Sequence, residues 1–233
     1  MNNKVNLNIR MSLNKATLDF LSDLEQNNNR EWFQDHKHLY KRAWQEMKEF
    51  TGKVIHGVAA FDPHIHTAID PGKCLFRIYR DVRFRKDKTP YKTWFGAGIS
   101  VNGRKLHGPE YYYHIQPGAS FLAVGYWRPE KDHLAAIRQE IDYNGDEWRT
   151  LLAKISEKVG SPIEPDRDDV LVRPPAGFPA DHPELEYLKL KSFTLSIPLA
   201  DRDVLRDNID SMVVEYYQAM HPFKEFLHRA IGD

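Results

Sequence analysis

The sequence predicts an α+β protein with a helical hairpin at its N-terminal end, a central antiparallel sheet of about four to five strands, and helices at its C-terminal end. Two observations predict this class. Apolar residues recur at three- and four-residue steps in the first sixty residues and again after residue 129, whereas alternating residues between turn signals fill the part from residue 74 to 127. Helices and strands therefore occupy separate blocks, unlike the alternation of a βαβ protein.

The N-terminal hairpin is predicted by two apolar runs at helical spacing. The first covers residues 13–24, and the second, which is longer, covers residues 32–58. Between them, Asn27-Asn28-Asn29 is a loop and cap signal. The two runs are therefore expected to form two antiparallel helices.

The central sheet is predicted from alternating segments that follow the turn signals Asp62-Pro63 and Asp70-Pro71-Gly72. Pro117-Gly118 is a tight turn between two of these segments, which favours an antiparallel meander. The expected strands are residues 74–85, 92–101, 111–116, 120–127 and 193–199.

Helices return after the sheet, beginning near Pro129 and Asp146. The proline-rich residues 160–183 are expected to form an irregular surface connection. Asp201 is expected to cap a last long helix, which Pro222 breaks before a short tail helix.

The composition narrows the class of protein. Of the 233 residues, 12% are aromatic, which argues against disorder. No apolar run approaches the ~20 residues that span a bilayer, so no membrane partner is expected. The single cysteine, Cys74, suits a cytoplasmic protein. Residues 1–10 are expected to be a disordered leader and residues 11–233 one α+β domain, with no particular oligomeric state predicted.

One segment departs from the balanced charge of the chain. The formal net charge is zero, so the whole-protein charge gives no argument for nucleic acid. Residues 77–92 read RIYRDVRFRKDKTPYK and hold seven basic and two acidic residues, a net charge of +5. A function based on charge must therefore depend on this segment.

On a strand, the side chains of this segment would divide between two faces. Arg77, Asp81 and Arg83 share one face, where the planar forks of the arginines suit phosphate or carboxylate. Arg80 falls on the apolar face, between Ile78 and Val82. It therefore needs a carboxylate, several carbonyls, a cavity or a β-bulge.

These residues suggest an anion site with roles for each side chain. Arg77, Arg80, Arg83 and Lys88 would hold the anion, and Asp81 would orient the arginines. Tyr91 would donate hydrogen bonds or protons, so Asp81 and Tyr91 are candidate catalytic residues. Tyr112 and His114 share one face of a predicted strand, and His114 is a candidate general acid or base if that face also bears the arginines. A structural role for the charged network is the alternative.

A metal site is not expected. His64 and His66, with Asp62 and Asp70, have the spacing of a ligand pair, but no third ligand stands at a diagnostic distance, so a polar loop is favoured. The chain has no phosphate-binding loop, dinucleotide fingerprint or nucleophile elbow. No cofactor is therefore predicted.

Residues 77–91 match the signature RxxRDxRFxxxKxPY at all eight of its fixed positions. The stretches NNNREWF (27–33), GPEYYYHIQPG (108–118) and GFPADHP (177–183) look like further features of the same family. The chain thus resembles, over nearly all of its length after residue 11, a bacterial and fungal family filed as domain of unknown function 2461. The resemblance marks the signature as the family's defining feature and implies no particular activity, cofactor or catalytic residue.

The predicted partner is a small anionic ligand, phosphorylated or carboxylated, with an enzymatic activity left open. One alternative is nucleic-acid binding or metal-independent phosphodiester cleavage on the sheet face, which the pI of about 7.2 does not favour. The other is an interaction module in which the signature forms a buried network between sheet and helices.

Overall fold

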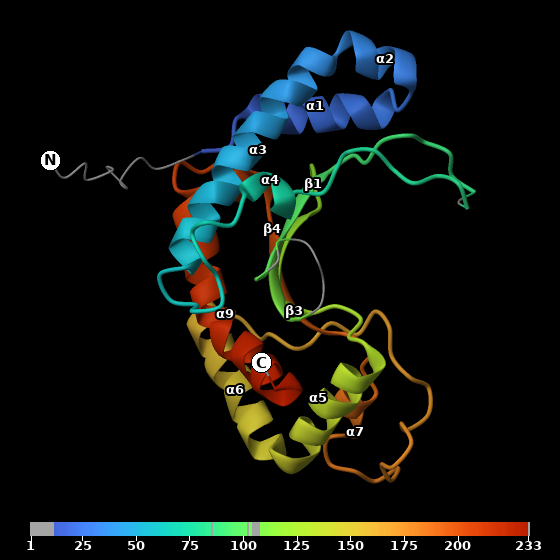
Figure 1. Ribbon diagram of the computed structural model, residues 1–233, viewed down its shortest axis with the longest axis vertical. Helices are drawn as coiled ribbons and strands as arrows, with labels where there is room; N and C mark the ends of the chain where they lie inside the picture. Colours follow the sequence, from blue (N-terminus) through green and yellow to red (C-terminus); the bar gives the residue numbers. More distant parts are fainter. Residues whose placement is uncertain (1–11, 85, 102, 104–107, 233) are drawn as a thin grey trace, which may run out of the picture.

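The computed structural model describes residues 12–84, 86–101, 103 and 108–232 (Figure 1). Within them, four antiparallel strands form one sheet in the order β1-β2-β3-β4. The strands are β1 (Phe95–Ile99), β2 (Glu110–Ile115), β3 (Ser120–Tyr126) and β4 (Phe193–Leu199). The predicted α+β class is confirmed. The leader expected at residues 1–10 lies outside the described residues.

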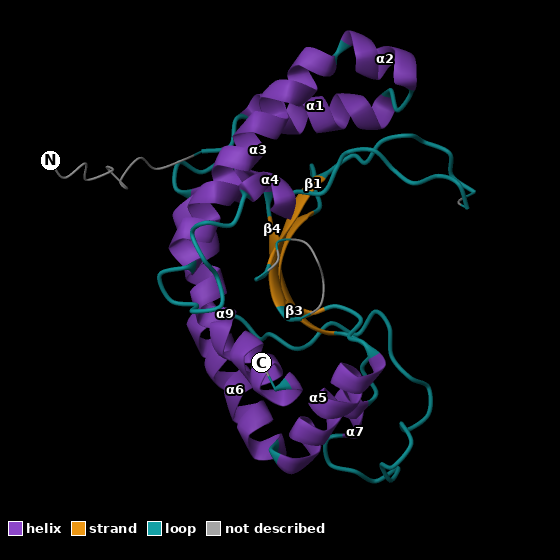
Figure 2. Ribbon diagram, viewed as in Figure 1, coloured by secondary structure: helices purple, strands orange, loops and turns teal. Residues whose placement is uncertain are grey.

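One face of the sheet is covered by two long helices, α3 (Lys37–Val58) and α9 (Ile209–Ile231) (Figure 2). Strand alternation sends every second side chain to this face. Tyr111, Tyr113, Leu122, Val124 and Leu195 are completely buried there. The opposite face of the sheet is open. It lies on the inner side of a crescent-shaped molecule (Figure 1).

The N-terminal hairpin consists of α1 (Lys15–Gln26), α2 (Arg30–Asp35) and α3. The side chain of Asn14 accepts the backbone N–H of Ala16 at the start of α1, and that of Asn29 accepts the N–H of Trp32 at the start of α2. The predicted hairpin is confirmed. The single helix expected over residues 32–58 is instead divided at His36 into α2 and α3.

The C-terminal half contains α5 (Lys131–Tyr143), α6 (Gly145–Val159), the short α7 (Leu185–Leu188) and α8 (Asp201–Val204), and α9. The prediction that Pro222 breaks the last helix is wrong, because α9 continues through it. Apolar residues on both sides of Pro222, from Met220 to Leu227, are buried in the core. Their burial offsets a lost hydrogen bond and a steric clash that together cost about 3 kcal/mol.

The strand predicted over residues 74–85 is also wrong. After the short helix α4 (Pro71–Cys74), the chain makes single bridges from Leu75 to Ala97 and from Tyr79 to Tyr91. It then leaves the sheet as a projecting double-stranded excursion (Figure 1), here called the arm and defined as residues 77–84 and 86–91. A regular strand here would place Arg80 on the same face as the buried Ile78, where an unpaired guanidinium is costly.

Candidate functional site

The arm pairs most of its charges locally. Arg83 donates to both carboxylate oxygens of Asp81, at 3.0 and 2.6 Å, and Arg80 donates to Asp87 at 2.6 Å and to Thr89. The hydrogen bonds from Arg83 lower the pKa of Asp81 to about 2. The Arg83 side chain is 75% exposed. The Asp81–Arg83 pair of the signature therefore lies at the surface and not in a buried network between sheet and helices.

The predicted binding residues of the arm thus differ in whether their side chains already bind other groups of the protein. Lys88 donates to the backbone carbonyl of Val82 at 2.9 Å, and Arg80 and Arg83 are engaged as described. Arg77 is exposed and, within the described part of the chain, has no hydrogen-bond or ion-pair partner.

The base of the arm is fixed to the N-terminal hairpin through Tyr91. This side chain is only 3% exposed, and its ring stacks on Phe33 with centroids 4.0 Å apart. The Asn28 amide accepts the Tyr91 N–H at 3.1 Å and donates to the Tyr91 carbonyl at 3.0 Å. The stretch NNNREWF and the Pro-Tyr end of the signature therefore meet in space. The pKa of Tyr91 is raised, and burial is the largest cause.

His114 lies on the open face of the sheet, away from the paired arginines. Its Nδ1 is 3.0 Å from the Tyr112 hydroxyl, which confirms that these two residues share a face. Its ring lies between Trp94 and Phe121, with centroid distances of 4.6 and 4.9 Å. Burial lowers its pKa. The described contacts of His114 do not include the arm, so the structure does not unite it with Asp81 and Tyr91.

A cavity of about 670 Å³ opens on this face and is here called the sheet pocket. Aromatic side chains form much of its wall, while carboxylates gather on the side of β4 and the segment that precedes it. Its lining includes Phe76, Trp94, Glu110, Tyr112, Phe121, Trp127, Asp166, Asp168, Asp169, Thr194 and Ser196.

Glu110 is the acidic group buried most deeply in the sheet pocket. It is 7% exposed, and its Oε2 has no hydrogen-bond partner among the described residues. Burial raises its pKa to about 8. Gly125 stands directly opposite on β3 with φ of 140°, and a Cβ there would lie 2.0 Å from the Phe193 carbonyl oxygen. Only glycine fits at this position, so no neighbouring side chain from β3 covers the carboxyl group.

The two sides of the sheet pocket differ in charge. On the β4 side, Asp166 accepts hydrogen bonds from the Thr194 and Ser196 hydroxyls, both at 2.7 Å. On the arm side, the ammonium of Lys92 lies 4.6 Å from the Trp94 ring centroid and 5.2 Å from that of Phe76. A cation thus stands where the basic segment joins the pocket, opposite a wall that accepts hydrogen bonds.

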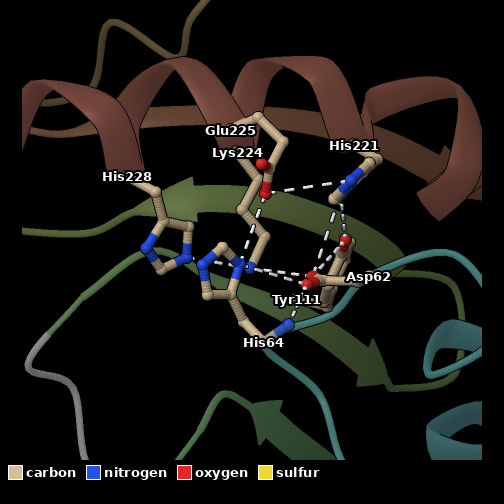
Figure 3. Close-up of polar contacts among 7 residues, drawn as sticks. All are labelled: Asp62, His64, Tyr111, His221, Lys224, Glu225 and His228. Atoms are coloured by element: carbon tan, nitrogen blue, oxygen red, sulfur yellow. Dashed lines mark hydrogen bonds and ion pairs between the residues drawn. The ribbon is translucent and has the colours of Figure 1, made fainter. Parts of the chain in front are cut away.

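A second polar site lies on the covered face of the sheet, between α9 and the loop after α3 (Figure 3). This Asp62 cluster consists of Asp62, His64, Tyr111, His221, Lys224, Glu225 and His228. Asp62 Oδ2 lies 2.8 Å from Lys224 Nζ and accepts the Tyr111 hydroxyl at 2.8 Å. Lys224 Nζ is also 2.9 Å from His228 Nε2.

The electrostatics of the Asp62 cluster are set by burial and pairing together. Burial alone would raise the pKa of Asp62, but the Lys224 ammonium, the His64 backbone N–H and the Tyr111 hydroxyl bring it below its ordinary value. Burial and the neighbouring Lys224 lower the pKa of His228 to about 3. The cluster therefore holds an ionised carboxylate beside neutral imidazole.

Sequence reasoning found only part of these two sites. It noted Asp62 and His64 but paired them with His66 and Asp70; in the structure His66 is exposed and Asp70 caps α4. The partners from α9 were missed. The signal for them was polar residues four apart on the last helix, His221 with Glu225 and Lys224 with His228.

Comparison with known proteins adds a family but no named activity. No helix of the described residues is long and apolar enough to cross a membrane. No curated protein matches the chain. No solved structure matches it either. The model of one family, described as conserved hypothetical protein (DUF2461), matches residues 16–226. The chain therefore belongs to the DUF2461 family of conserved hypothetical proteins.

Proposed function

We propose that this protein binds a small ligand that carries an anionic group and a flat ring, with the ring in the sheet pocket and the anionic group at Lys92. The observation that carries the proposal is the position of Lys92, whose ammonium contacts two aromatic walls of the pocket. The ligand class is phosphorylated or carboxylated, and nucleoside monophosphates are its simplest ring-bearing members.

The aromatic wall supports a ring as the body of the ligand. Trp94, Phe121 and Tyr112 line one pocket on a rigid antiparallel sheet. Stacking of a base on an aromatic side chain contributes about 1–3 kcal/mol and tolerates different bases. Ligand sites of this kind are mostly apolar, with a few placed polar groups that fix orientation.

The charge distribution supports an anionic group at one end of the ligand. Lys92 closes the segment with net charge +5, and Arg77, Arg80, Arg83 and Lys88 of the arm add positive potential beside it. At the other end, Asp166 and Glu110 favour amino or hydroxyl donors on the ligand. A ligand with an acidic end and a donor-bearing ring satisfies both sides.

An enzymatic role is a narrower form of this proposal and assigns proton transfer to Glu110 and His114. A carboxyl group with a pKa of about 8 exists in both protonation states near neutral pH. General acid–base catalysis works best with such a group. Asp81 and Tyr91, which were predicted as catalytic, would then support the arm.

Single-stranded nucleic acid is a second candidate because of the arm's tip. Phe84 is 95% exposed there, and the Arg83 guanidinium lies 5.9 Å from its ring centroid. Exposed aromatic and basic side chains together suit a strand of stacked bases. Binding of that kind weakens steeply between about 50 and 200 mM salt.

The test is calorimetric titration of the full chain with nucleoside monophosphates, the matching nucleosides, inorganic phosphate, an aromatic carboxylate and a short single-stranded RNA. We expect at least one ring-bearing anion to bind about tenfold more tightly than its nucleoside or than phosphate alone, which corresponds to about 1.4 kcal/mol. Lys92→Gln should remove that advantage.

The matched control is Lys154→Gln, an exposed lysine on α6 that is remote from the pocket in sequence and element. It should leave the affinity unchanged. Equal loss in both variants, or no binding by any ring-bearing anion, would remove the basis of the proposal. Tight binding of RNA alone, abolished by salt, would favour the second candidate.

A further inference from the structure

Four side chains of the Asp62 cluster come as two pairs from two segments. Asp62 and His64 stand two residues apart in the loop after α3, and His221 and Glu225 stand four apart on one side of α9 (Figure 3). Carboxylate oxygens and imidazole nitrogens are the ligands that divalent transition metals take in proteins. One atom each of Asp62, His221 and Glu225 lies within 4.8 Å of the others.

The hydrogen bonds around Tyr111 fix the free nitrogen of His221. The Tyr111 hydroxyl has one proton, which it donates to Asp62 Oδ2 at 2.8 Å. The hydroxyl oxygen must therefore accept a hydrogen bond from the ring N–H at His221 Nδ1, which is 2.8 Å away. The neutral ring then presents an unprotonated Nε2, which lies 3.8 Å from Glu225 Oε1. Metal-bound histidines are held in this way, with the other ring N–H donated to a fixed partner.

The atoms of His64, Asp62 and Glu225 that face one another have the spacing of ligands around a common ion. His64 Nδ1 lies 3.3 Å from Asp62 Oδ1 and 3.4 Å from Glu225 Oε1. Ligands at about 2.0–2.1 Å from a tetrahedral zinc ion lie roughly 3.4 Å apart. His64 Nδ1 and Glu225 Oε1 are both buried atoms without a hydrogen-bond partner in the described residues.

The charges of the cluster leave room for a cation. Lys224 occupies Asp62 Oδ2 at 2.8 Å, so it compensates one carboxylate and leaves Oδ1 toward His64. Glu225 brings a second negative charge. Asp62, Glu225 and Lys224 together bring two carboxylates and one ammonium, which leaves one negative charge without a compensating cation among these three side chains. Access is open on one side, because the Glu225 side chain is 41% exposed.

From these contacts we infer that Asp62, His221 and Glu225 form a binding site for one divalent transition-metal ion, with Zn²⁺ as its test ion and with His64, beside Asp62 and Glu225, as a further ligand. Tyr111 and Lys224 act as positioning residues that orient His221 and Asp62. This site is separate from the sheet pocket, because Tyr111 and Tyr112 are neighbours on β2 whose side chains point to opposite faces.

The experiment is titration of Zn²⁺ into the untagged, chelator-treated full chain, with Co²⁺ as a spectroscopic probe. We expect one Zn²⁺ per chain and Co²⁺ absorption bands in the visible range from mixed nitrogen and oxygen ligands. His64→Gln and Glu225→Gln should each weaken Zn²⁺ binding by at least about tenfold. Both residues are partly exposed, so the fold should tolerate these changes, and circular dichroism in chelator checks this.

The matched controls are His66→Gln and Glu215→Gln, an exposed histidine in the same loop and an exposed glutamate on the same helix. They should keep the wild-type affinity. Absence of stoichiometric Zn²⁺ binding overturns the inference. So does binding that His64→Gln and Glu225→Gln leave unchanged, because the ion would then lie at other histidines.

Discussion

At Glu110, the burial that raises the pKa of the carboxyl group also makes the fold less stable at high pH. Its carboxyl group is buried, and burial raises its pKa from 4.5 to about 8. In the unfolded chain the group ionises near pH 4.5, whereas in the folded chain it stays protonated up to about pH 8. The folded state therefore binds more protons in this range, and stability contributed by this group is present below pH 4.5 and lost as the pH rises through 8.

Glu110→Gln should remove this loss. Each unit of pKa difference corresponds to about 1.4 kcal/mol, so we expect the variant to be more stable than the wild type at pH 8 by up to about 5 kcal/mol and close to it at pH 4.5. Urea denaturation at the two pH values measures this. Glu157→Gln, at an exposed site on α6, should show no such dependence. A variant less stable than the wild type at pH 8 would mean that Glu110 has an ionic partner there.

At the scale of elements, the arm is attached firmly at its base and loosely elsewhere. Ile78 and Tyr91 are buried, and the backbone pairs Arg80 N–H with the Pro90 carbonyl at 2.9 Å. Beyond these residues the charged side chains contact one another at the surface, where ion pairs contribute little to stability. The tip of the arm therefore contributes little to the stability of the fold.

Replacement of residues 81–89 by Asn-Gly, a turn that suits a two-residue hairpin, should change the melting temperature by less than about 2 °C. Affinity for a ring-bearing monophosphate should stay within about threefold, because Lys92 remains, and a charge at the rim acts mainly on the association rate. Calorimetry on the shortened chain measures both. Complete loss of small-ligand binding would place the site on the tip instead of in the sheet pocket.

Local patterns in the sequence identify elements better than they identify neighbours. Alternation predicted the strands at 111–116, 120–127 and 193–199 closely, and it placed Tyr112 with His114. The same alternation in residues 74–85 did not mark a strand of the sheet, because most of this segment belongs to the arm. A period of two shows which side chains share a face, but it does not show whether neighbouring strands pair with the segment. Arg80, predicted to need a partner, finds Asp87 across the arm.

The Asp62 cluster shows the limit of that reasoning. Its two halves are more than 150 residues apart in the chain and meet only because α9 and the loop after α3 pack on the same face of the sheet. No local period carries this information. The surroundings of Glu110 likewise depend on other strands, because Gly125 of β3 pairs with Glu110 on one side and with Thr194 of β4 on the other.

At the scale of the whole molecule, the sheet separates two sites. The covered face holds the Asp62 cluster beside α9 (Figure 3), and the open face bears the sheet pocket. Tyr217 on α9 donates to the Tyr112 carbonyl at 2.8 Å, so the helix that carries half of the cluster is bonded to the strand that bears both sites. Strand β2 thus contributes to both sites, with Tyr111 in the Asp62 cluster and Tyr112 in the sheet pocket.

The central claim is that a ring-bearing anion occupies the sheet pocket. A crystal structure of the full chain with the tightest ligand from the titration tests it most directly. We expect the ring within about 4 Å of Trp94 or Phe121 and the anionic group within hydrogen-bond distance of Lys92. A ligand found only on the tip of the arm, or only at the Asp62 cluster, would contradict it.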